Sequence, residues 1–424
     1  NDVHPTDIVE LLENLSEGAG KRAFNALTPE KAVQVIEGLK YDLRLRILYS
    51  LPRNYMVKLL NEMSNDKMAD FLGELPEELS NKLLEMLSKK EKLVVESLLE
   101  YDENIAGGLM TTEYVFFYPE TSIKEVLEQL PDIAPDAETI YYIYVVNHKN
   151  EIKGVVSLRD LILAEPELPI KDVMLADVKT IDVWMDQEEV AKAFEKYGLL
   201  GMPVVDNDKK LLGIITVDDV FDVIEAEATE DILKLAGADF QIDIEESTAW
   251  SRAYKRLPWL LIALAGQIFS VQLMSGFSDA LEAVIALSFF IPVLMDMGGN
   301  VGTQSSTIIV RGLATDNIDI NKSIFENILR EGTVGFLSGV LSGLVAALIA
   351  YIWQADTRLG FVVGISMTIT LTVAAMIGAF VPLALNKIGK DPADSSGPLV
   401  TTVLDIVGLL VYFGFVSMFM SYLL

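Results

Sequence analysis

The sequence predicts a multidomain protein with four parts: an α-helical N-terminal domain wound as a short superhelix, a duplicated α/β domain, a long connecting helix, and an α-helical membrane domain of five spans per subunit. Three observations predict this class. Prolines mark regularly spaced helix starts near the N-terminus, a segment in the middle of the chain is repeated without gaps, and long apolar stretches fill the C-terminal part. Repeats at a fixed period and apolar stretches of ~20 residues are typical of such architectures.

Residues 1–106 are expected to form the helical domain. Apolar residues recur three and four positions apart, as in KAVQVIEGL and NKLLEMLSK. Pro29, Pro52 and Pro76 recur about every 24 residues, the kind of period that marks helical repeats. Each lies at an expected helix start, where the missing N–H of proline costs nothing. The pattern indicates a small α-solenoid, which is an interaction or sensing module without chemistry of its own.

Residues 107–222 contain the internal repeat. The segment YVVNHKNEIKGVVSLRD aligns without gaps on PVVDNDKKLLGIITVDD, which begins at Pro203. Each copy has an apolar strand, a polar turn, a second strand and a Ser or Thr that opens a helix. The duplication predicts two α/β units of the same β-β-α order.

This duplicated unit resembles a tandem CBS (Bateman) domain. The resemblance implies a regulatory domain that dimerises and often binds adenine nucleotides. Tyr142, Arg159 and Asp160 match positions that the family uses around ATP, so ATP is an expected ligand. An Asp160 that only caps or solvates its own helix fits the sequence equally well.

Residues 223–250 are expected to form a long connecting helix that leads to the membrane. In DDVFDVIEAEATEDILKL the acids alternate with an apolar side that includes Val220, Val223 and Ile232. A solvated linker helix is the simpler interpretation and stays open.

Residues 251–424 hold five stretches apolar and long enough to cross a bilayer as helices. Lys and Arg are concentrated before the first stretch and in alternate short loops. This bias predicts that the N-terminal half is cytosolic and that the C-terminus lies outside. The expected spans are about 257–277, 281–310, 328–353, 360–385 and 398–424.

The charge of the chain is strongly asymmetric. The formal net charge is −29, of which −27 falls on residues 1–250 and only −2 on residues 251–424. Such a field repels nucleic acid and attracts cations, although a merely solubilising acidic surface is the simpler explanation. With no Cys and two His, thiolate and zinc sites are not expected. Because no nucleophile–base constellation, P-loop or zinc motif is present, the chain is not expected to be an enzyme.

Asp405 is a lone carboxylate inside the last apolar stretch, roughly 10 Å from its start at Pro398 at ~1.5 Å per residue. A charge in hydrocarbon is costly, so such an acid usually faces a bundle interior or a water-filled path. The neighbours Thr401, Thr402 and Gly408 suit close packing or a wet path. Asp405 is therefore predicted to be an ion filter. A structural acid bonded to a neighbouring helix remains the alternative.

The second apolar stretch, FFIPVLMDMGGNVGTQSSTIIVRGLA, carries a dense polar stripe. Hydroxyl and amide oxygens suit a hydrated hard cation, although hydrogen bonding between helices also explains them. Asp296 is the one further acid expected at the depth of Asp405. The helix is expected to kink or unwind at Pro292, Gly298, Gly299 and Gly302. At membrane depth this is tolerated only where the backbone is buried in protein or lines a cavity.

Three segments, in order after the helical domain and the CBS-like pair, resemble the MgtE family of magnesium channels: VDDVFDVIEAEATEDI, GGNVGTQSSTIIVRGLA and KDPADSSGPLVTTVLDIVGLLVYF. The resemblance covers nearly the whole chain. It implies a homodimeric, Mg²⁺-selective channel for magnesium uptake across the cytoplasmic membrane of a bacterium, with membrane lipid around it. It also implies a central pore with a plug helix, Asp405 as the filter acid for hydrated Mg²⁺, Asp391 at the cytosolic mouth, and Asn300, Thr303 and Thr307 along the pore.

The resemblance further implies a gate that cytosolic Mg²⁺ closes. At low Mg²⁺ the acidic domains repel one another, and at high Mg²⁺ the ions bridge their carboxylates. The ion then binds the closed state better, which is the differential affinity that a ligand-driven shift needs. The implied regulatory ligands are Asp66, Asp70, Asp186, Glu188, Asp219, Asp222, Glu227, Glu230 and Asp231.

Two positions depart from the family pattern. Gly198 stands where the resemblance implies an acid in the second CBS repeat, and Gly397 where an amide residue is frequent near the pore mouth. The alternative function is a coupled transporter or efflux protein for Mg²⁺, Co²⁺ or another divalent cation. Asp296 is the residue that keeps this alternative open.

Overall fold

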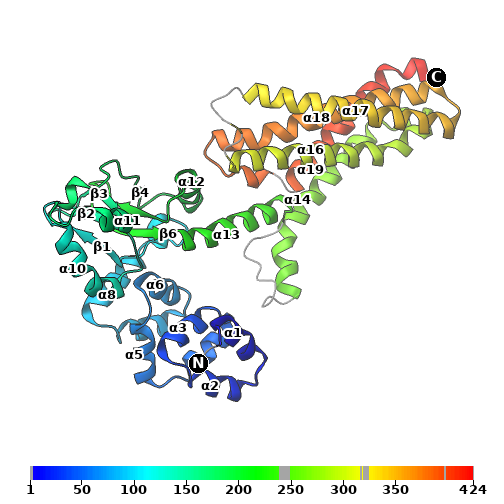
Figure 1. Cartoon of the computed structure of the whole chain (residues 1–424). Coiled ribbons are helices and arrows are strands. Elements are labelled where there is room, and N and C mark those ends of the chain that lie inside the picture. The colour runs from blue at the N-terminus through cyan, green and yellow to red at the C-terminus, as the bar shows by residue number, and fades with distance from the viewer. Residues whose placement is uncertain (1–2, 238–248, 316–317, 319–323, 396–397, 424) are drawn as a thin grey trace. The chain divides into compact units, whose positions relative to one another are not determined.

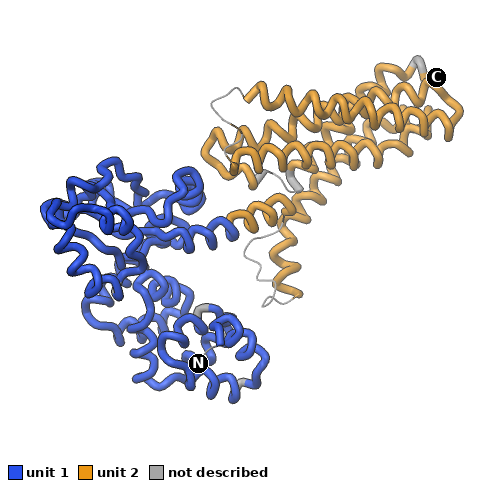
Figure 2. The backbone as a smooth tube through the Cα atoms, viewed as in Figure 1, with its two compact units in different colours: residues 1–226 blue, residues 227–424 orange. Residues whose placement is uncertain are grey.

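The computed structural model describes residues 3–237, 249–315, 318, 324–395 and 398–423. The chain divides into two compact units, residues 1–226 and 227–424, which are coloured separately in Figure 2. Within the described residues the strands belong to unit 1, and long helices dominate unit 2 (Figure 1).

The N-terminal part of unit 1 is a run of short helices that share one apolar core. Pro29 occupies the first turn of α3, and Pro52 and Pro76 are the N-caps of α5 and α7, so all three prolines start helices as predicted. Ile36 and Leu60 are completely buried within this core. The helices are α1 (Pro5–Asn14), α2 (Glu17–Phe24), α3 (Pro29–Glu37), α4 (Tyr41–Leu48), α5 (Arg53–Asn61), α6 (Asn65–Gly73), α7 (Glu77–Leu84) and α8 (Lys89–Leu98).

The internal repeat folds into two three-stranded sheets of the same order, β1-β2-β3 and β4-β5-β6. In each sheet the first pair of strands is parallel and the second pair is antiparallel. Gly154 lies opposite Val145 and Gly213 opposite Val204, so the two copies also share their register. The strands are β1 (Tyr114–Phe117), β2 (Thr139–Val146), β3 (Ile152–Ser157), β4 (Ile181–Asp182), β5 (Gly201–Val205) and β6 (Leu211–Thr216).

Helices flank these strands and continue into unit 2. The second copy ends in α13 (Val217–Leu235), which begins earlier than the connecting helix expected over 223–250. Residues 238–248 of that expected helix lie outside the described residues. The remaining elements of this part are α9 (Ala106–Leu109), α10 (Ile123–Ile133), η1 (Ala134–Asp136), α11 (Leu158–Leu163), η2 (Ile170–Asp172) and α12 (Gln187–Tyr197).

Within the described residues, unit 2 has five helices that are long and apolar enough to cross a membrane. Each of them overlaps one of the five expected spans, and the predicted fold class is confirmed. The last expected span, 398–424, ends earlier than predicted, because its main helix stops at Met418. The helices are α14 (Ala249–Ser275), α15 (Ser278–Ala283), η3 (Ile285–Phe290), α16 (Ile291–Ala314), α17 (Ile324–Gln354), α18 (Thr357–Lys387), η4 (Pro392–Ser395), α19 (Pro398–Met418) and α20 (Met420–Leu423).

The second expected span changes its helical form just before Pro292, because η3 is a 3₁₀ helix up to Phe290 and α16 is an α-helix from Ile291. The unwinding expected at Gly298, Gly299 and Gly302 is wrong, because α16 is uninterrupted there. Pro292 lies in its first turn, where no backbone hydrogen bond is lost. Its glycines serve close helix packing instead. A Cβ placed on Gly378 of α18 would lie 2.1 Å from the carbonyl oxygen of Gly302, so the two backbones touch directly. Because there is no hydrophobic driving force between helices in a membrane, the close van der Waals packing that small residues allow stabilises such crossings.

Candidate functional site

Asp405 lies on α19, and its side chain is only 6% exposed. The Nε2 of Gln267, on α14, donates a hydrogen bond of 2.6 Å to its Oδ2. The structure thus shows a bond to a neighbouring helix, which the sequence left as the alternative to a wet path. It also shows a cavity of about 290 Å³ at the same carboxylate, lined by Leu235, Ala236, Ala263, Gln267, Thr303, Thr401, Thr402 and Asp405.

Small residues on α14 and α16 allow these helices to pack closely against α19 around this cavity. A Cβ on Gly266 of α14 would lie 1.9 Å from the Cγ2 of Thr402, and one on Gly302 of α16 would lie 2.1 Å from a methyl group of Leu404. Both glycines therefore let their helices approach α19 around Asp405 more closely than a larger residue permits. The polar wall of the cavity follows from this packing.

The polar stripe of α16 separates into two faces. Asn300, Thr303 and Thr307 are exposed and lie on one face, at the three- and four-residue spacing of a helix. Of these three predicted pore residues, only Thr303 lines the cavity with Asp405. The Nδ2 of Asn300 donates a 3.1 Å bond to the Oδ2 of Asp296 one turn earlier.

Asp391, predicted at the pore mouth, is held by a cation of the protein itself. The Nζ of Lys234, near the end of α13, lies 2.5 Å from an oxygen of Asp391 and 2.5 Å from one of Glu230. Burial opposes the charge of this ammonium, but the bonds to Asp391 and Glu230 outweigh burial and raise the pKa of Lys234. Two predicted Mg²⁺ ligands thus share one lysine.

Four acids of unit 1 surround Asp70 of α6: Asp66, Glu74, Glu103 and Asp219. Asp70 is exposed as a residue, yet the protein around its carboxyl group displaces much of the hydration of that group. Burial and then the charges of these four acids raise the pKa of Asp70 to about 7. We call these five residues the acidic cluster. The structure thereby joins Asp66, Asp70 and Asp219, which are far apart in the sequence.

Asp66 is the buried member of the acidic cluster, with 7% of its surface exposed. Its Oδ1 has no hydrogen-bond partner among the residues that the structure describes. Burial also raises the pKa of Asp219, although its Oδ2 accepts a 2.5 Å bond from the hydroxyl of Thr216. An unpaired carboxylate oxygen in such surroundings costs free energy, and a cation would remove that cost.

The other predicted regulatory acids make local bonds on α12 or follow one another along α13. Asp186 caps α12 by accepting from the backbone N–H of Glu188, and Glu188 pairs with Lys192 at 2.9 Å. Asp222 is exposed on α13, and Glu227 and Asp231 follow it on the same helix. Across the described ranges, no three His, Asp or Glu side chains converge closely enough to coordinate a metal directly.

Three residues of these sites were not predicted from the sequence. Gln267 is the lone amide in its part of the first apolar stretch, and Lys234 is the lone cation near the end of the acidic α13. Glu331 lies within the third expected span and is 8% exposed, with its Oε2 accepting a 2.9 Å bond from the hydroxyl of Ser305. Asp296 is therefore not the only further acid at membrane depth. A search for single polar residues inside each span finds both Gln267 and Glu331.

Comparisons with known proteins agree over the whole chain. The family model described as "MgtE intracellular N domain" matches residues 3–104, CBS domain models match 106–167 and 170–226, and the model "Divalent cation transporter" matches 291–415. A protein of Bacillus subtilis named magnesium transporter MgtE is 37% identical over 99% of this chain and 92% of its own length. The Thermus thermophilus protein of that name is 39% identical over 97% of this chain and 92% of its own length.

The chain belongs to the MgtE family of magnesium transporters. The family predicted from the sequence is thereby confirmed, and so is the expectation that the chain is a transporter and not an enzyme. The cytosolic domain of the Mg²⁺ channel MgtE, solved in complex with ATP, is 39% identical and has a TM-score of 0.51. It covers 52% of this chain, and 91% of that domain is matched. The soluble part of a magnesium transporter is 35% identical, with a TM-score of 0.50 over 53% of this chain and 89% of its own length.

The CBS repeat of this MgtE family member has a cavity of about 680 Å³ beside β2 and α11. Tyr142 and Arg159 both line it, as predicted for a nucleotide site, together with Tyr141, Ser157 and Leu200. Asp160 does not line it, and its Oδ2 accepts a 2.6 Å bond from the hydroxyl of Ser157 instead. Ser157 is the N-cap of α11, and Asp160 supports this cap through its bond to the Ser157 hydroxyl.

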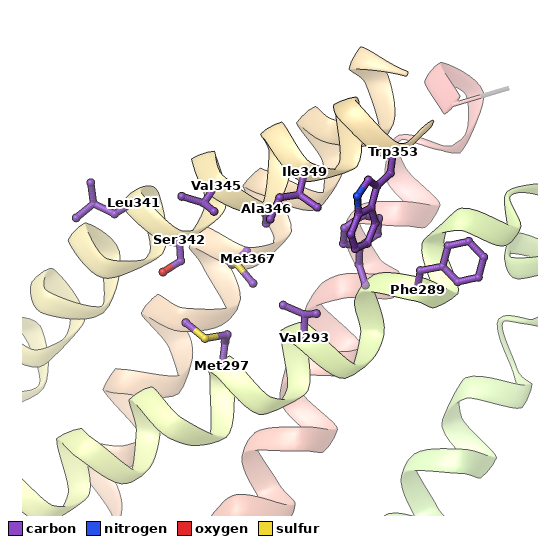
Figure 3. Close-up of a pocket in the computed structure, with 11 residues that line it drawn as sticks. Phe289, Val293, Met297, Leu341, Ser342, Val345, Ala346, Ile349, Trp353 and Met367 are labelled. Atoms are coloured by element: carbon purple, nitrogen blue, oxygen red, sulfur yellow. The ribbon is translucent and has the colours of Figure 1, made fainter. Parts of the chain in front are cut away.

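In unit 2, a cavity of about 430 Å³ lies between η3, α16, α17 and α18, where Figure 3 shows the side chains that surround it. Apart from the hydroxyl of Ser342, these side chains are apolar, among them Val293, Met297 and Trp353. Mg²⁺ requires oxygen ligands or its own waters, so this cavity does not suit the ion. The smaller cavity at Asp405 does.

Proposed function

We propose that the protein is a homodimeric, Mg²⁺-selective channel for magnesium uptake, with Asp405 as its ion filter. The observation that carries the proposal is the membrane-buried carboxylate at the wall of a cavity of about 290 Å³ with the polar side chains of Thr303, Thr401 and Thr402. Mg²⁺ dehydrates reluctantly, and six waters of ~30 Å³ occupy about 180 Å³. The cavity is large enough for the hydrated ion, and one carboxylate suffices to attract it.

The exposed polar face of α16 supports a dimer. Asn300, Thr303 and Thr307 lie on a helix that is apolar enough to span a membrane, yet their side chains are exposed in the single chain. Polar groups at membrane depth face protein or water and not lipid. A second copy of the chain opposite this face encloses the water-filled path that these residues require.

The acidic cluster supports gating by Mg²⁺. Asp66, Asp70 and Asp219 meet within unit 1, one of them has an unpaired oxygen among the described residues, and the pKa of Asp70 is raised to about 7. These groups repel one another until a divalent cation joins them. Because no three of them converge as direct ligands in the described ranges, the ions are expected to bridge carboxylates through their waters. The cation then stabilises the arrangement that holds the carboxylates together, which is the closed one.

Further parts of the proposal concern the domains and the nucleotide. We assign residues 1–106 to Mg²⁺ sensing, 107–222 to the CBS domain, 223–250 to the plug helix and 251–424 to the pore, with the first three in the cytosol and the C-terminus outside. Binding of ATP beside Tyr142 and Arg159 is supported by the ATP complex of the similar cytosolic domain.

Glu331 favours the alternative function, a transporter that couples Mg²⁺ or Co²⁺ to another ion. Coupling to protons uses a titratable group besides the filter, and Glu331 is buried at membrane depth with one hydroxyl partner, Ser305. The two functions differ in reversal potential. The Mg²⁺ current of a channel reverses at a potential that the Mg²⁺ gradient alone sets, at every pH and Na⁺ concentration. The reversal potential of a coupled transporter also depends on the gradient of the second ion.

The test of the main proposal is Mg²⁺ flux into proteoliposomes. The Asp405→Asn variant is expected to lose at least about 100-fold of the flux, since the amide has no charge to attract the ion. Asp279→Asn, which changes an exposed acid in the first turn of α15, is the matched control and keeps the flux. Wild-type flux in the Asp405→Asn variant contradicts the role of Asp405 as filter.

A further inference from the structure

We propose that Gln267 is a positioning residue for the filter carboxylate and that it sets the preference for Mg²⁺ over Ca²⁺. The inference rests on the proposed role of Asp405 as the ion filter. Its basis is the 2.6 Å bond from the Nε2 of Gln267 to the Oδ2 of Asp405 at the wall of their common cavity.

The chemistry of the two groups fixes how they face each other. An ionised carboxylate only accepts hydrogen bonds, so Gln267 must present its amide N–H to Asp405 and turn its own oxygen elsewhere. The donor carries no charge, and it therefore holds the carboxylate without cancelling its attraction for cations. A lysine at the same place would neutralise the filter, as Lys234 does for Asp391 and Glu230.

The bond also limits how a cation is bound. It occupies a lone pair of one oxygen of Asp405 and holds that oxygen next to Gln267. Ca²⁺ accepts carboxylates directly and in bidentate fashion, whereas Mg²⁺ keeps several waters and takes few direct protein ligands. A carboxylate with one oxygen occupied is therefore a poorer ligand for Ca²⁺ but still a good partner for the waters of Mg²⁺.

The helix packing next to Gln267 supports this role. Gly266 is a point of close approach between α14 and α19, because a Cβ there would lie 1.9 Å from the Cγ2 of Thr402. The close approach brings the amide of Gln267 within hydrogen-bond distance of Asp405. Adding a methyl group at position 266 moves α14 away and lengthens the bond without changing either polar side chain.

The first test is Ca²⁺ block of Mg²⁺ flux by the full-length protein in proteoliposomes, with Gln267→Met as the variant. Met has nearly the length of Gln but no donor, so Oδ2 becomes free for direct ligation. The Ca²⁺ concentration that halves the Mg²⁺ flux is expected to fall about fivefold or more. The maximal Mg²⁺ flux without Ca²⁺ is expected to change by a smaller factor. Gln272→Met, at an exposed position of the same helix, is the matched control and is blocked like the wild type.

Two further variants keep the test decisive. Gln267→Glu places a second carboxylate at the same distance and is expected to strengthen Ca²⁺ block even more than Met does; it decides the question if the Met variant does not fold. Gly266→Ala is expected to shift the block in the direction of Gln267→Met, and the double variant adds nothing further, because both changes break one bond.

The outcomes separate this inference from the function on which it rests. If Mg²⁺ flux of the wild type does not depend on Asp405, the proposed channel fails, whatever Gln267 does. If the flux depends on Asp405 while Gln267→Met and Gln267→Glu are blocked by Ca²⁺ like the wild type, Gln267 only packs, and the present inference is overturned. Additive shifts in the double variant with Gly266→Ala overturn it as well.

Discussion

Asp66 in unit 1 and Asp405 in unit 2 are both buried carboxylates, but their surroundings are opposite. Asp405 has a neutral donor, Gln267, and hydroxyl-bearing neighbours. Asp66 has an oxygen without a partner in the described residues and contributes to the raised pKa of the neighbouring Asp70. The difference agrees with the two roles proposed for these acids, Asp405 as filter and Asp66 as part of the Mg²⁺ sensor. A filter must stay in one geometry while ions pass, whereas a sensor must be costly to maintain until its ion binds.

The largest effect is expected from removing the repulsion between the carboxylates of the acidic cluster in unit 1. In the variant Asp66→Asn, Asp70→Asn, Asp219→Asn, only Glu74 and Glu103 of the acidic cluster keep a charge, so the repulsion that Mg²⁺ neutralises is weaker. Flux at low Mg²⁺ should remain, while the cytosolic Mg²⁺ concentration that halves it rises about tenfold or more. Flux measured against Mg²⁺ inside the liposomes checks this. A triple variant that closes at the wild-type concentration would remove the acidic cluster from the gate.

The next effect concerns pH, since the pKa of Asp70 is raised to about 7. Protons compete with Mg²⁺ for Asp70, so the half-inhibiting Mg²⁺ concentration should fall as the pH rises from about 6 to about 8. The same shift acts on stability. Because the native pKa lies above the unfolded value of ~3.9, stability without Mg²⁺ is lost as the pH rises through about 7.

The variant Asp70→Asn is the control for the pH effect. It should make both the Mg²⁺ inhibition and the Mg²⁺-free melting temperature less dependent on pH between about 6 and about 8. Thermal unfolding in detergent and flux at several pH values measure the two. An unchanged pH profile in this variant assigns the titration to another group.

A smaller effect is expected from Lys234, which contrasts with Gln267 as a charged partner of carboxylates. Lys234→Gln leaves Asp391 and Glu230 to repel each other, which loosens the end of α13. Flux at low internal Mg²⁺ should rise about two- to threefold, since an exposed ion pair contributes ~1 kcal/mol or less. Lys210→Gln, which breaks a similar pair with Asp208 in the CBS domain, is the control. Equal flux in both variants would show that the pair at Asp391 does not restrain the pore.

The smallest effect is expected from Glu331→Gln, which adds a third buried acid to the comparison. The amide oxygen still accepts the bond from Ser305, so a structural Glu331 predicts flux within about twofold of the wild type. Flux at fixed Mg²⁺ and varied pH is the measurement. A loss of flux or of pH dependence favours the coupled transporter over the channel.

The periodic features of the fold were predictable because they are local. Apolar spacing, the prolines at the starts of α3, α5 and α7, and the duplicated strands each depend on residues close in the sequence. At Pro292 the second span passes from the 3₁₀ helix η3 to α16, which begins one residue earlier, so this proline removes no hydrogen bond from the interior of α16. Its glycines signalled contact with α18 and α19, which a single helix does not reveal.

The sequence by itself determined the order of domains, the five apolar helices, the acidity of the first half and the choice of Asp405 as the filter candidate, because composition and spacing carry these directly. Only the tertiary structure decided which groups meet. Gln267 bonds to Asp405, which lies 138 positions further along the chain, and Lys234 bonds to Asp391. Asp66, Asp70 and Asp219 come from separate parts of the sequence and lie near one another only in the folded chain. The physical reason is that a hydrogen bond or a charge acts over a few ångströms of space, and helix packing alone sets which residues come within that distance.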